Sequence, residues 1–206
     1  MKKISTLFKK DPNDLSKVIN EINPENQWVF DGGAIATRKF DGIACRIITQ
    51  CEEDEKEGIQ TYTNLYKRYD VKKGKTVPEG AIPCQEADTV TGHHPHWILC
   101  NRTKPEDKYF FEAFDTLEDK IDGTYELCGE TISTERFSKN LNVEKVVGHK
   151  LIKHGSEVLL IEDLSFEGLR DYLSDPTNDI EGIVFYNKYD ERMCKLRKKD
   201  FKIKRV

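Results

Sequence analysis

Lys39 stands between an apolar run and a turn, in the sequence Lys39-Phe40-Asp41-Gly42. It could be a surface charge, or it could be a nucleophile, because a neutral lysine amine can attack the α-phosphate of a nucleotide and carry the nucleotide as a phosphoramidate. From average residue usage, roughly one chain in twenty of this length contains Lys-x-Asp-Gly by accident. The reaction also needs a metal, cations on the same phosphate and a group that holds the ribose.

Charged residues of these types follow further along the chain. They are Arg68 in LYKRYD, Glu126 in YELCG, Glu181 in DIEGIVFY, and Lys195 and Arg197 in CKLRK. Each alone could be an exposed strand acid or a member of a basic tail. Their order is more specific, since EGIV is followed 14 residues after its Glu by an alternating Lys-x-Arg. On a strand, Lys195 and Arg197 would point to the same face and could reach one phosphate.

Together these segments resemble the motifs of the covalent nucleotidyltransferase superfamily, which comprises ATP-dependent DNA ligases, RNA ligases and mRNA capping enzymes. The resemblance spans roughly residues 31 to 200. KFDG is similar to motif I, LYKRYD to motif Ia, YELCG to motif III, EGIVF to motif IV and CKLR to motif V. The phrases YELCGETI, LIKHG and EGIVF most resemble the 5'-to-3' RNA ligases of viruses and eukaryotes.

The resemblance implies a role for each charged residue of motifs I, IV and V. Lys39 would be the nucleophile that carries AMP. Asp41 and Glu181 would hold waters of a catalytic Mg²⁺ or Mn²⁺ ion, and Lys195 and Arg197 would clamp the α-phosphate. The neighbouring cations and the metal would disfavour the ammonium form of Lys39.

The resemblance also implies how the nucleoside is held. Glu126 would bind the ribose hydroxyls, and Arg68 would contact the ribose or an RNA 5'-phosphate. The family often has an aromatic residue that stacks on adenine about 20 positions after the motif III glutamate, and this chain has Val146 there. His154 in LIKHG is the weaker candidate for a nucleotide contact.

The implied function is an ATP-dependent RNA ligase that joins RNA 5'-phosphate and 3'-hydroxyl ends, as in RNA repair, through lysyl-AMP and an adenylylated RNA end. A capping guanylyltransferase would use the same lysine chemistry with GTP, and a DNA ligase is a further alternative. A non-catalytic RNA-binding module is another alternative, but such a module would not need both Lys39 and Glu181. We expect one nucleotidyltransferase domain over 1–206, with its motifs between 39 and 198 and without a C-terminal oligonucleotide-fold domain.

Composition is compatible with a globular enzyme. Of the 206 residues, 37% are hydrophobic and 34% charged, and the formal net charge is −4. The segment 191–206 nevertheless carries eight basic and two acidic residues, which favours either a local anionic partner or a solvated basic tail. The six cysteines have no CxxC spacing and are expected to be reduced and mostly buried.

Turn signals divide the chain into short apolar runs, and the absence of βαβ alternation predicts an α+β fold with mainly antiparallel sheets and flanking helices. Leu15, Val18, Ile19 and Ile22 have helical spacing and predict a helix over 13–22. A second helix is predicted over 165–173. The expected strands are QWVF, AIATRKF, IACRIITQC, IQTYTNLYKRYDV, HWILC, GTYELCGE, DIEGIVFYN and MCKLRKKDF. A loop is expected over 52–58.

Two further patterns carry less weight. DVKKGKT ends like a phosphate-binding P-loop, but it lacks the first glycine and the preceding apolar strand. GHHPHW places three histidines within four residues, and we expect ordinary loop histidines there rather than metal ligands. No run is long enough to span a membrane, so we expect an intracellular protein, cytoplasmic or nuclear. We also expect a monomer, encoded by a cell or a virus.

Overall fold

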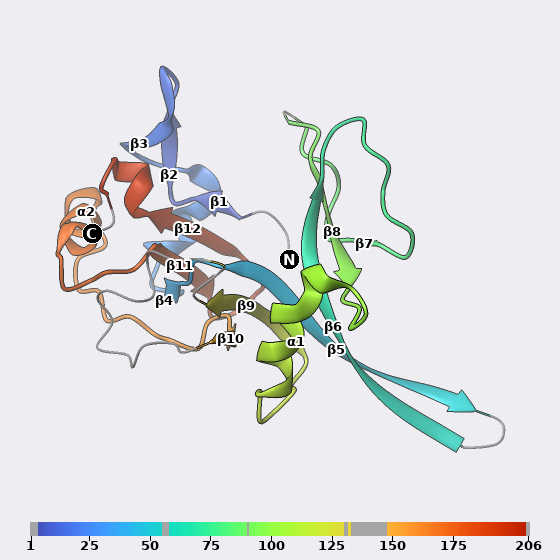
Figure 1. The fold of residues 1–206 in the computed structure, drawn as a ribbon. Helices are drawn as coiled ribbons and strands as arrows, with labels where there is room; N and C mark the ends of the chain where they lie inside the picture. Colours follow the sequence, from blue (N-terminus) through green and yellow to red (C-terminus); the bar gives the residue numbers. More distant parts are fainter. Residues whose placement is uncertain (1–3, 55–57, 90, 130–131, 133–147, 205–206) are drawn as a thin grey trace. The chain divides into compact units, whose positions relative to one another are not determined.

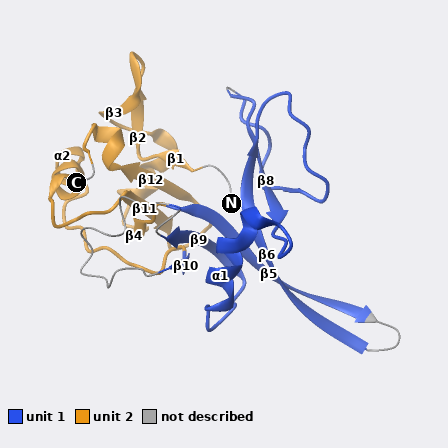
Figure 2. Cartoon of the chain, viewed as in Figure 1, with its two compact units in different colours: residues 1–3, 42–137, 143–153 blue, residues 4–41, 138–142, 154–206 orange. Residues whose placement is uncertain are grey.

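The computed structural model describes residues 4–54, 58–89, 91–129, 132 and 148–204. The chain packs as two compact units, which Figure 2 shows in two colours. Unit 1 comprises Met1–Lys3, Gly42–Phe137 and Val143–Lys153, and unit 2 comprises Ile4–Asp41, Ser138–Asn142 and His154–Val206. Each of the three sheets lies within one unit, so each unit is described by itself.

Unit 2 is built on a four-stranded sheet (Figure 1). Its strands in spatial order are β1 (Ser5–Thr6), β12 (Met193–Arg197), β11 (Gly182–Asn187) and β4 (Ala34–Lys39). β11 pairs antiparallel with both β12 and β4, whereas β1 pairs parallel with β12. This arrangement joins the C-terminal end of β4 to two strands that lie some 140 residues later in the chain.

The N-terminal part of unit 2 differs from the prediction. The segment predicted as a helix over 13–22 is the strand β3 (Asp14–Ile22), which pairs antiparallel with β2 (Phe8–Asp11). In a helix Leu15 and Val18 would share one face, but Leu15 is 72% exposed and Val18 is buried. The β-branched residues of this segment favour the extended backbone, and pairing with β2 decides the outcome.

A second correction concerns QWVF, which was predicted as a strand and belongs to the 3-10 helix η1 (Pro24–Val29). Pro24 begins this helix, and the side chain of Asn23 accepts a hydrogen bond from the backbone N–H of Glu25 at 3.3 Å. Proline and an Asn cap favour a helical first turn, so these two residues outweigh the strand preference of the aromatic segment. The predicted C-terminal helix is confirmed as α2 (Phe166–Ser174).

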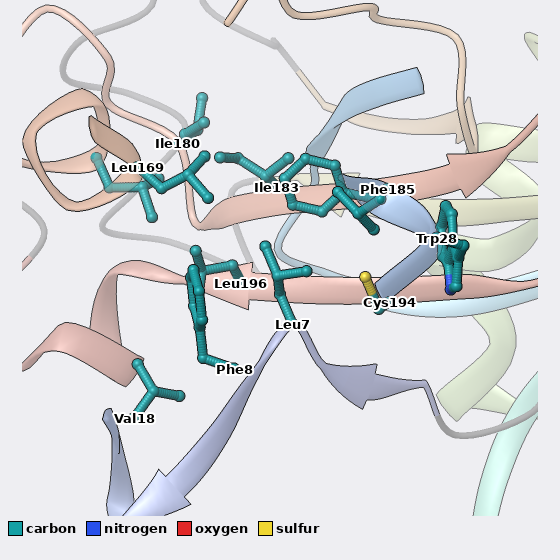
Figure 3. Close-up of a cluster of buried hydrophobic side chains, with 12 residues drawn as sticks. Leu7, Phe8, Val18, Trp28, Leu169, Ile180, Ile183, Phe185, Cys194 and Leu196 are labelled. Atoms are coloured by element: carbon teal, nitrogen blue, oxygen red, sulfur yellow. The ribbon is translucent and has the colours of Figure 1, made fainter. Parts of the chain in front are cut away.

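The core of unit 2 lies on one face of the sheet, where twelve apolar side chains are buried together (Figure 3). It combines residues from η1, α2 and the central strands. Its members are Leu7, Phe8, Val18, Trp28, Val29, Leu169, Leu173, Ile180, Ile183, Phe185, Cys194 and Leu196. The 3-10 helix η3 (Lys198–Phe201) follows β12 directly, and Phe201 packs edge-on against Phe166 of α2.

Unit 1 contains a six-stranded antiparallel sheet. In spatial order its strands are β10 (His149–Lys153), β9 (Gly123–Gly129), β5 (Ile43–Asp54), β6 (Gly58–Val71), β8 (His94–Leu99) and β7 (Ile82–Pro83). The 3-10 helix η2 (Pro105–Asp107) leads into α1 (Lys108–Asp115), whose Phe110 and Phe114 complete a core with residues of β5, β6, β9 and β10.

β5 and β6 form a long hairpin, which extends beyond the other strands of unit 1 in Figure 1. We predicted a loop over residues 52–58, but β5 continues to Asp54 and β6 begins at Gly58. The ladder still pairs Glu52 with Gln60 and Glu53 with Ile59. Continuation of this backbone ladder therefore outweighs the low strand propensity of the acidic run.

The structure confirms a mainly-β, mostly antiparallel fold with a few short helices. Among the described residues, neither α1 nor α2 is long and apolar enough to cross a membrane. All six cysteines are free thiols and four of them are buried, as expected. Burial raises the pKa of Cys100 to about 12, which leaves this thiol unreactive near neutral pH.

The core of unit 2 gives a stability prediction. Phe185 is fully buried at the centre of the sheet, and we expect Phe185→Ala to lower the free energy of unfolding by about 3–5 kcal/mol, because it removes an aromatic side chain and leaves a cavity. Urea denaturation followed by tryptophan fluorescence measures the change. The control is Leu160→Ala at a side chain that is 90% exposed, and equal losses in the two variants would contradict this core.

Candidate active site

Three predicted site residues, Lys39, Lys195 and Arg197, meet on one face of the unit 2 sheet. Gly182 of β11 is paired with Lys39 of β4 on one side and with Arg197 of β12 on the other, so these residues form one row across three strands. Lys195 lies two residues before Arg197 and is paired with Val184. Because paired residues and residues two apart share a face, all three cations project to the same side.

The opposite face of the same strands is the buried core, which contains Ile183 and Leu196. Arg38 is paired with Ile183 and therefore lies on this second face. The side chain of Arg38 is only 5% exposed. Its guanidinium group lies 5.3 Å from the ring centroid of Phe40 and donates to both carboxylate oxygens of Glu157 at 3.3 Å. Arg38 and Lys39 therefore lie on opposite faces of the sheet, and Arg38 is a buried structural cation.

The amine of Lys39 is held by a carboxylate. Its Nζ atom lies 2.5 Å from Oε2 of Glu181 and also donates to the carbonyl oxygen of Phe40 at 3.2 Å. Both side chains of the ion pair are mostly buried, with 23% and 14% exposure. Glu181 is positioned by the backbone, since its carbonyl oxygen accepts a hydrogen bond from the N–H of Lys198 at the start of η3. The predicted nucleophile and the predicted metal-binding acid are therefore direct neighbours.

Asp41 follows β4 in unit 2 and is partly buried. Among the described residues, no group of three or more His, Cys, Asp or Glu side chains is placed to hold a metal ion by itself. Mg²⁺ usually keeps several waters and binds one or two carboxylates together with substrate phosphates. Asp41 and Glu181 have the carboxylate chemistry of such a ligand set, which two carboxylates alone would not complete.

Lys195 has the most perturbed environment of the three cations. Burial, followed by the nearby charges of Arg197 and Lys39, lowers its pKa to about 8. Asp200 and Glu181 oppose this shift but do not cancel it. A mostly buried lysine among cations is destabilised as an ammonium ion, so the folded protein pays free energy to hold positive charge there. An incoming anionic group would relieve that cost.

At two motif positions, neighbouring backbone lies so close that only glycine fits. A Cβ atom at Gly182 would lie 2.3 Å from the carbonyl oxygen of Leu196 and 2.7 Å from the Cα atom of Arg197. In unit 1, a Cβ atom at Gly42 would lie 2.1 Å from the carbonyl oxygen of Leu127. No side chain fits at either position, which explains the glycine in EGIV and in KFDG by packing alone.

Unit 1 contains the predicted ribose-binding residues. Glu126 of β9 is buried, and its Oε1 atom accepts the backbone N–H of Gly42 at 3.0 Å. The register pairs Glu126 with Ala44 of β5, and continuing the β5–β6 register places Arg68 opposite Ala44. Both side chains thus lie on the face opposite the unit 1 core. Arg68 forms an ion pair with Asp70 at 3.0 Å.

The remaining candidates are placed as follows. His154 follows β10, belongs to unit 2 and is partly buried. Val146, the position where the family often has an aromatic residue, lies outside the described residues. We expected loop histidines in GHHPHW, but His94 and His96 lie in β8, with ring centroids 4.2 Å apart. Pairing of β8 with β6 places them in the sheet.

Sequence reasoning missed two residues beside Arg197. Asp200 is fully buried and binds Arg197, and Lys10 of β2 binds the same carboxylate at 2.6 Å. We counted Asp200 only as part of a basic segment, although an acid three residues after Arg197 is a turn-capping spacing. Lys198 is buried too, whereas Lys199, Lys202 and Lys204 are exposed, so the basic segment 191–206 is only partly solvated. No local signal links Lys10 to Asp200, which lie 190 residues apart.

A scan against protein-family models and a search of curated proteins found no match to this chain.

The environment of Lys195 generates a prediction about pH. The pKa is about 8 in the folded protein and about 10.5 in an unfolded chain, so between these values the unfolded state binds more protons and stability rises with pH. We therefore expect Lys195→Met to raise Tm by a few degrees at pH 7, and this gain to shrink as the pH approaches 10. Thermal melts over pH 7–10 measure the difference.

Lys188→Met is the control, since Lys188 is an exposed lysine of the same unit. Lys188→Met should not show an increase in Tm at pH 7 that shrinks as the pH rises. A gain for Lys195→Met that stayed constant or grew with rising pH would contradict the assigned environment.

Proposed function

We propose that this protein is an ATP-dependent RNA ligase of the covalent nucleotidyltransferase type, with a ligase-type adenylation domain. One observation carries the proposal: Lys39 and Arg197 flank Gly182 in one row of the unit 2 sheet, while Glu181 holds the Lys39 amine. A lysine nucleophile, phosphate-binding cations and a carboxylate therefore come together from segments far apart in the chain. This set matches what lysyl-nucleotide chemistry requires.

In the first step, the neutral amine of Lys39 would attack the α-phosphorus of ATP. A nitrogen–phosphorus bond forms, the bond from the α-phosphorus to the pyrophosphate oxygen breaks, and pyrophosphate leaves. The ammonium form of Lys39 would lose one proton to solvent before the attack, and its nitrogen would release a second proton to solvent as the phosphoramidate forms. A Mg²⁺ or Mn²⁺ ion held by Asp41 and Glu181 would supply positive charge to the phosphate and disfavour the ammonium.

Lys195 and Arg197 would bind the α-phosphate from the same face. Both cations are already held close to Lys39 in the free protein, so they need not be assembled when charge develops on the phosphate oxygens. The pKa of Lys195 is lowered by burial and then by the charges of Arg197 and Lys39, and a bound phosphate would offset the repulsion from these two cations. For Glu126 and Arg68 of unit 1, the proposal keeps the roles that the resemblance implies, which are ribose binding for Glu126 and a contact with the ribose or the RNA 5'-phosphate for Arg68.

The later steps would transfer AMP to RNA. An oxygen of the RNA 5'-phosphate attacks the phosphorus of lysyl-AMP, which frees the Lys39 amine and gives an adenylylated RNA end. The 3'-hydroxyl of the other RNA end then attacks the 5'-phosphorus, forms the phosphodiester and releases AMP. In this sequence Lys39 acts as leaving group in the second step, and Lys195 and Arg197 stabilise the charge on the phosphate throughout.

The first step predicts a covalent label. With Mg²⁺ and α-³²P-ATP, the wild-type protein should retain acid-labile label after denaturation, because a phosphoramidate links AMP to Lys39. Lys39→Ala should abolish the label, since Lys39 is the residue paired with Gly182 in the row that also contains Arg197. Gel autoradiography of the denatured protein measures both.

The matched control is Lys188→Ala at an exposed lysine of unit 2, which should label like the wild type. Label that survives in Lys39→Ala would refute the assignment of Lys39 as the nucleophile. Label from α-³²P-GTP in place of ATP would identify a capping guanylyltransferase, and a wild type that takes no label from either nucleotide would leave only a binding module.

The second prediction concerns RNA. A 5'-³²P-labelled RNA with a free 3'-hydroxyl should be joined to itself or to a second strand in the presence of ATP, which makes the label resistant to phosphatase. Glu181→Gln should lower the rate of joining by at least about tenfold, because it removes a carboxylate that would hold the metal ion on the phosphate. Denaturing gels resolve substrate, adenylylated RNA and product, and joining of DNA but not RNA would contradict the RNA assignment.

A further inference from the structure

Asp200 is the most enclosed charged residue beside the candidate site. It lies in η3, three residues after Arg197, and is fully buried. Its Oδ2 atom accepts the backbone N–H of Arg197 at 2.9 Å and the Nε–H at 3.0 Å, while Oδ1 accepts from Nη2 at 2.9 Å. One carboxylate therefore binds both the backbone and the side chain of the same arginine.

This contact is bidentate. Two parallel hydrogen bonds to Nε and Nη2 fix the plane of a guanidinium group, whereas a single contact would leave it free to rotate. They occupy one edge of the group and leave Nη1 with its donors for another ligand. The Arg197 side chain is 18% exposed, so it is accessible from the face of the sheet that also holds Lys39 and Lys195.

Lys10 of β2 holds Asp200 from the other side. Its Nζ atom lies 2.6 Å from Oδ1. Burial by itself would raise the pKa of Asp200, but the hydrogen bonds from Arg197 and Lys10 outweigh it and leave the pKa below its usual value. The group thus stays ionised, and two cations on one carboxylate leave a net positive charge for an anion.

We propose that Asp200 is a positioning residue, which aims the guanidinium of Arg197 at the phosphate of the bound nucleotide and is itself held by Lys10 from the N-terminal hairpin. The inference rests on the proposed function for the identity of that phosphate. The alternative is that Asp200 only closes the turn after β12, since it also accepts a backbone N–H. A purely structural Asp200 would affect stability without affecting the rate of a folded variant.

The test is single-turnover formation of lysyl-AMP as a function of ATP concentration, at a temperature where every variant is folded. We expect Asp200→Asn to lower the rate at saturating ATP by about 10- to 100-fold, because a misdirected guanidinium no longer meets the phosphate. In a background of Arg197→Gln, the same substitution should lower the rate by no more than about a further twofold, because Asp200 acts through Arg197.

Asp190→Asn is the matched control. Asp190 also binds the Nε atom of an arginine nearby in sequence, Arg192, at 2.9 and 3.0 Å, but that pair is exposed. It should leave the rate unchanged. If Asp200→Asn does not fold, Lys10→Met replaces it, and a smaller fall in the same direction is expected because Asp200 loses its second partner.

A second measurement separates this inference from the proposed function. Tripolyphosphate should raise Tm in the wild type and in Asp190→Asn, and raise it much less in Asp200→Asn or Lys10→Met. If the wild type forms no lysyl-AMP, the proposed function fails, but this pattern of Tm shifts would still support Asp200 as the group that aims Arg197. Equal Tm shifts in all variants, no shift in the wild type, or normal labelling of folded Asp200→Asn would overturn the inference.

Discussion

The alignment of three strands at Gly182 is the constraint on which the candidate site depends. β11 is paired on both sides, and the absence of a side chain at Gly182 lets the backbone of β12 approach within a distance that no Cβ atom would allow. Because strand register has a period of two, a shift of one residue would turn Lys39 or Arg197 toward the core. The buried side chains of Ile183 and Leu196, on the opposite face, oppose such a shift.

The same sheet thus divides its charged residues between two kinds of environment. Arg38 is on the core face, where Glu157 and the ring of Phe40 satisfy it as part of the fold. Lys39 is the next residue and lies on the opposite face, where its partner is Glu181. Adjacent cations therefore differ in environment, because the alternation of a strand places them on different faces.

Much of the fold followed from the sequence because its strands are alternating or continuous apolar runs bounded by clear turns, as in β6 and β11. The prediction was wrong for β3, where the spacing of Leu15 and Val18 also suits a helix and where only pairing with β2 distinguishes the two. Within the site, motif spacing placed Lys195 and Arg197 on one face of a strand. Motif spacing could not predict the contact between Lys10 and Asp200, because a contact across 190 residues leaves no periodic signal in the sequence.

The numbers of cations and carboxylates on this face explain why the site destabilises the protein when no ligand is bound. Lys39 is matched by Glu181, and Arg197 by Asp200, so each of these cations has a carboxylate at hydrogen-bond distance. Lys195 lies among them, and burial, followed by the charges of Arg197 and Lys39, lowers its pKa despite the two acids. Positive charge is therefore in excess on this face, and a polyanionic ligand would remove repulsion that folding alone leaves in place. The face is thus better matched to a phosphate-bearing ligand than to water, which is the property expected of a preorganised binding site.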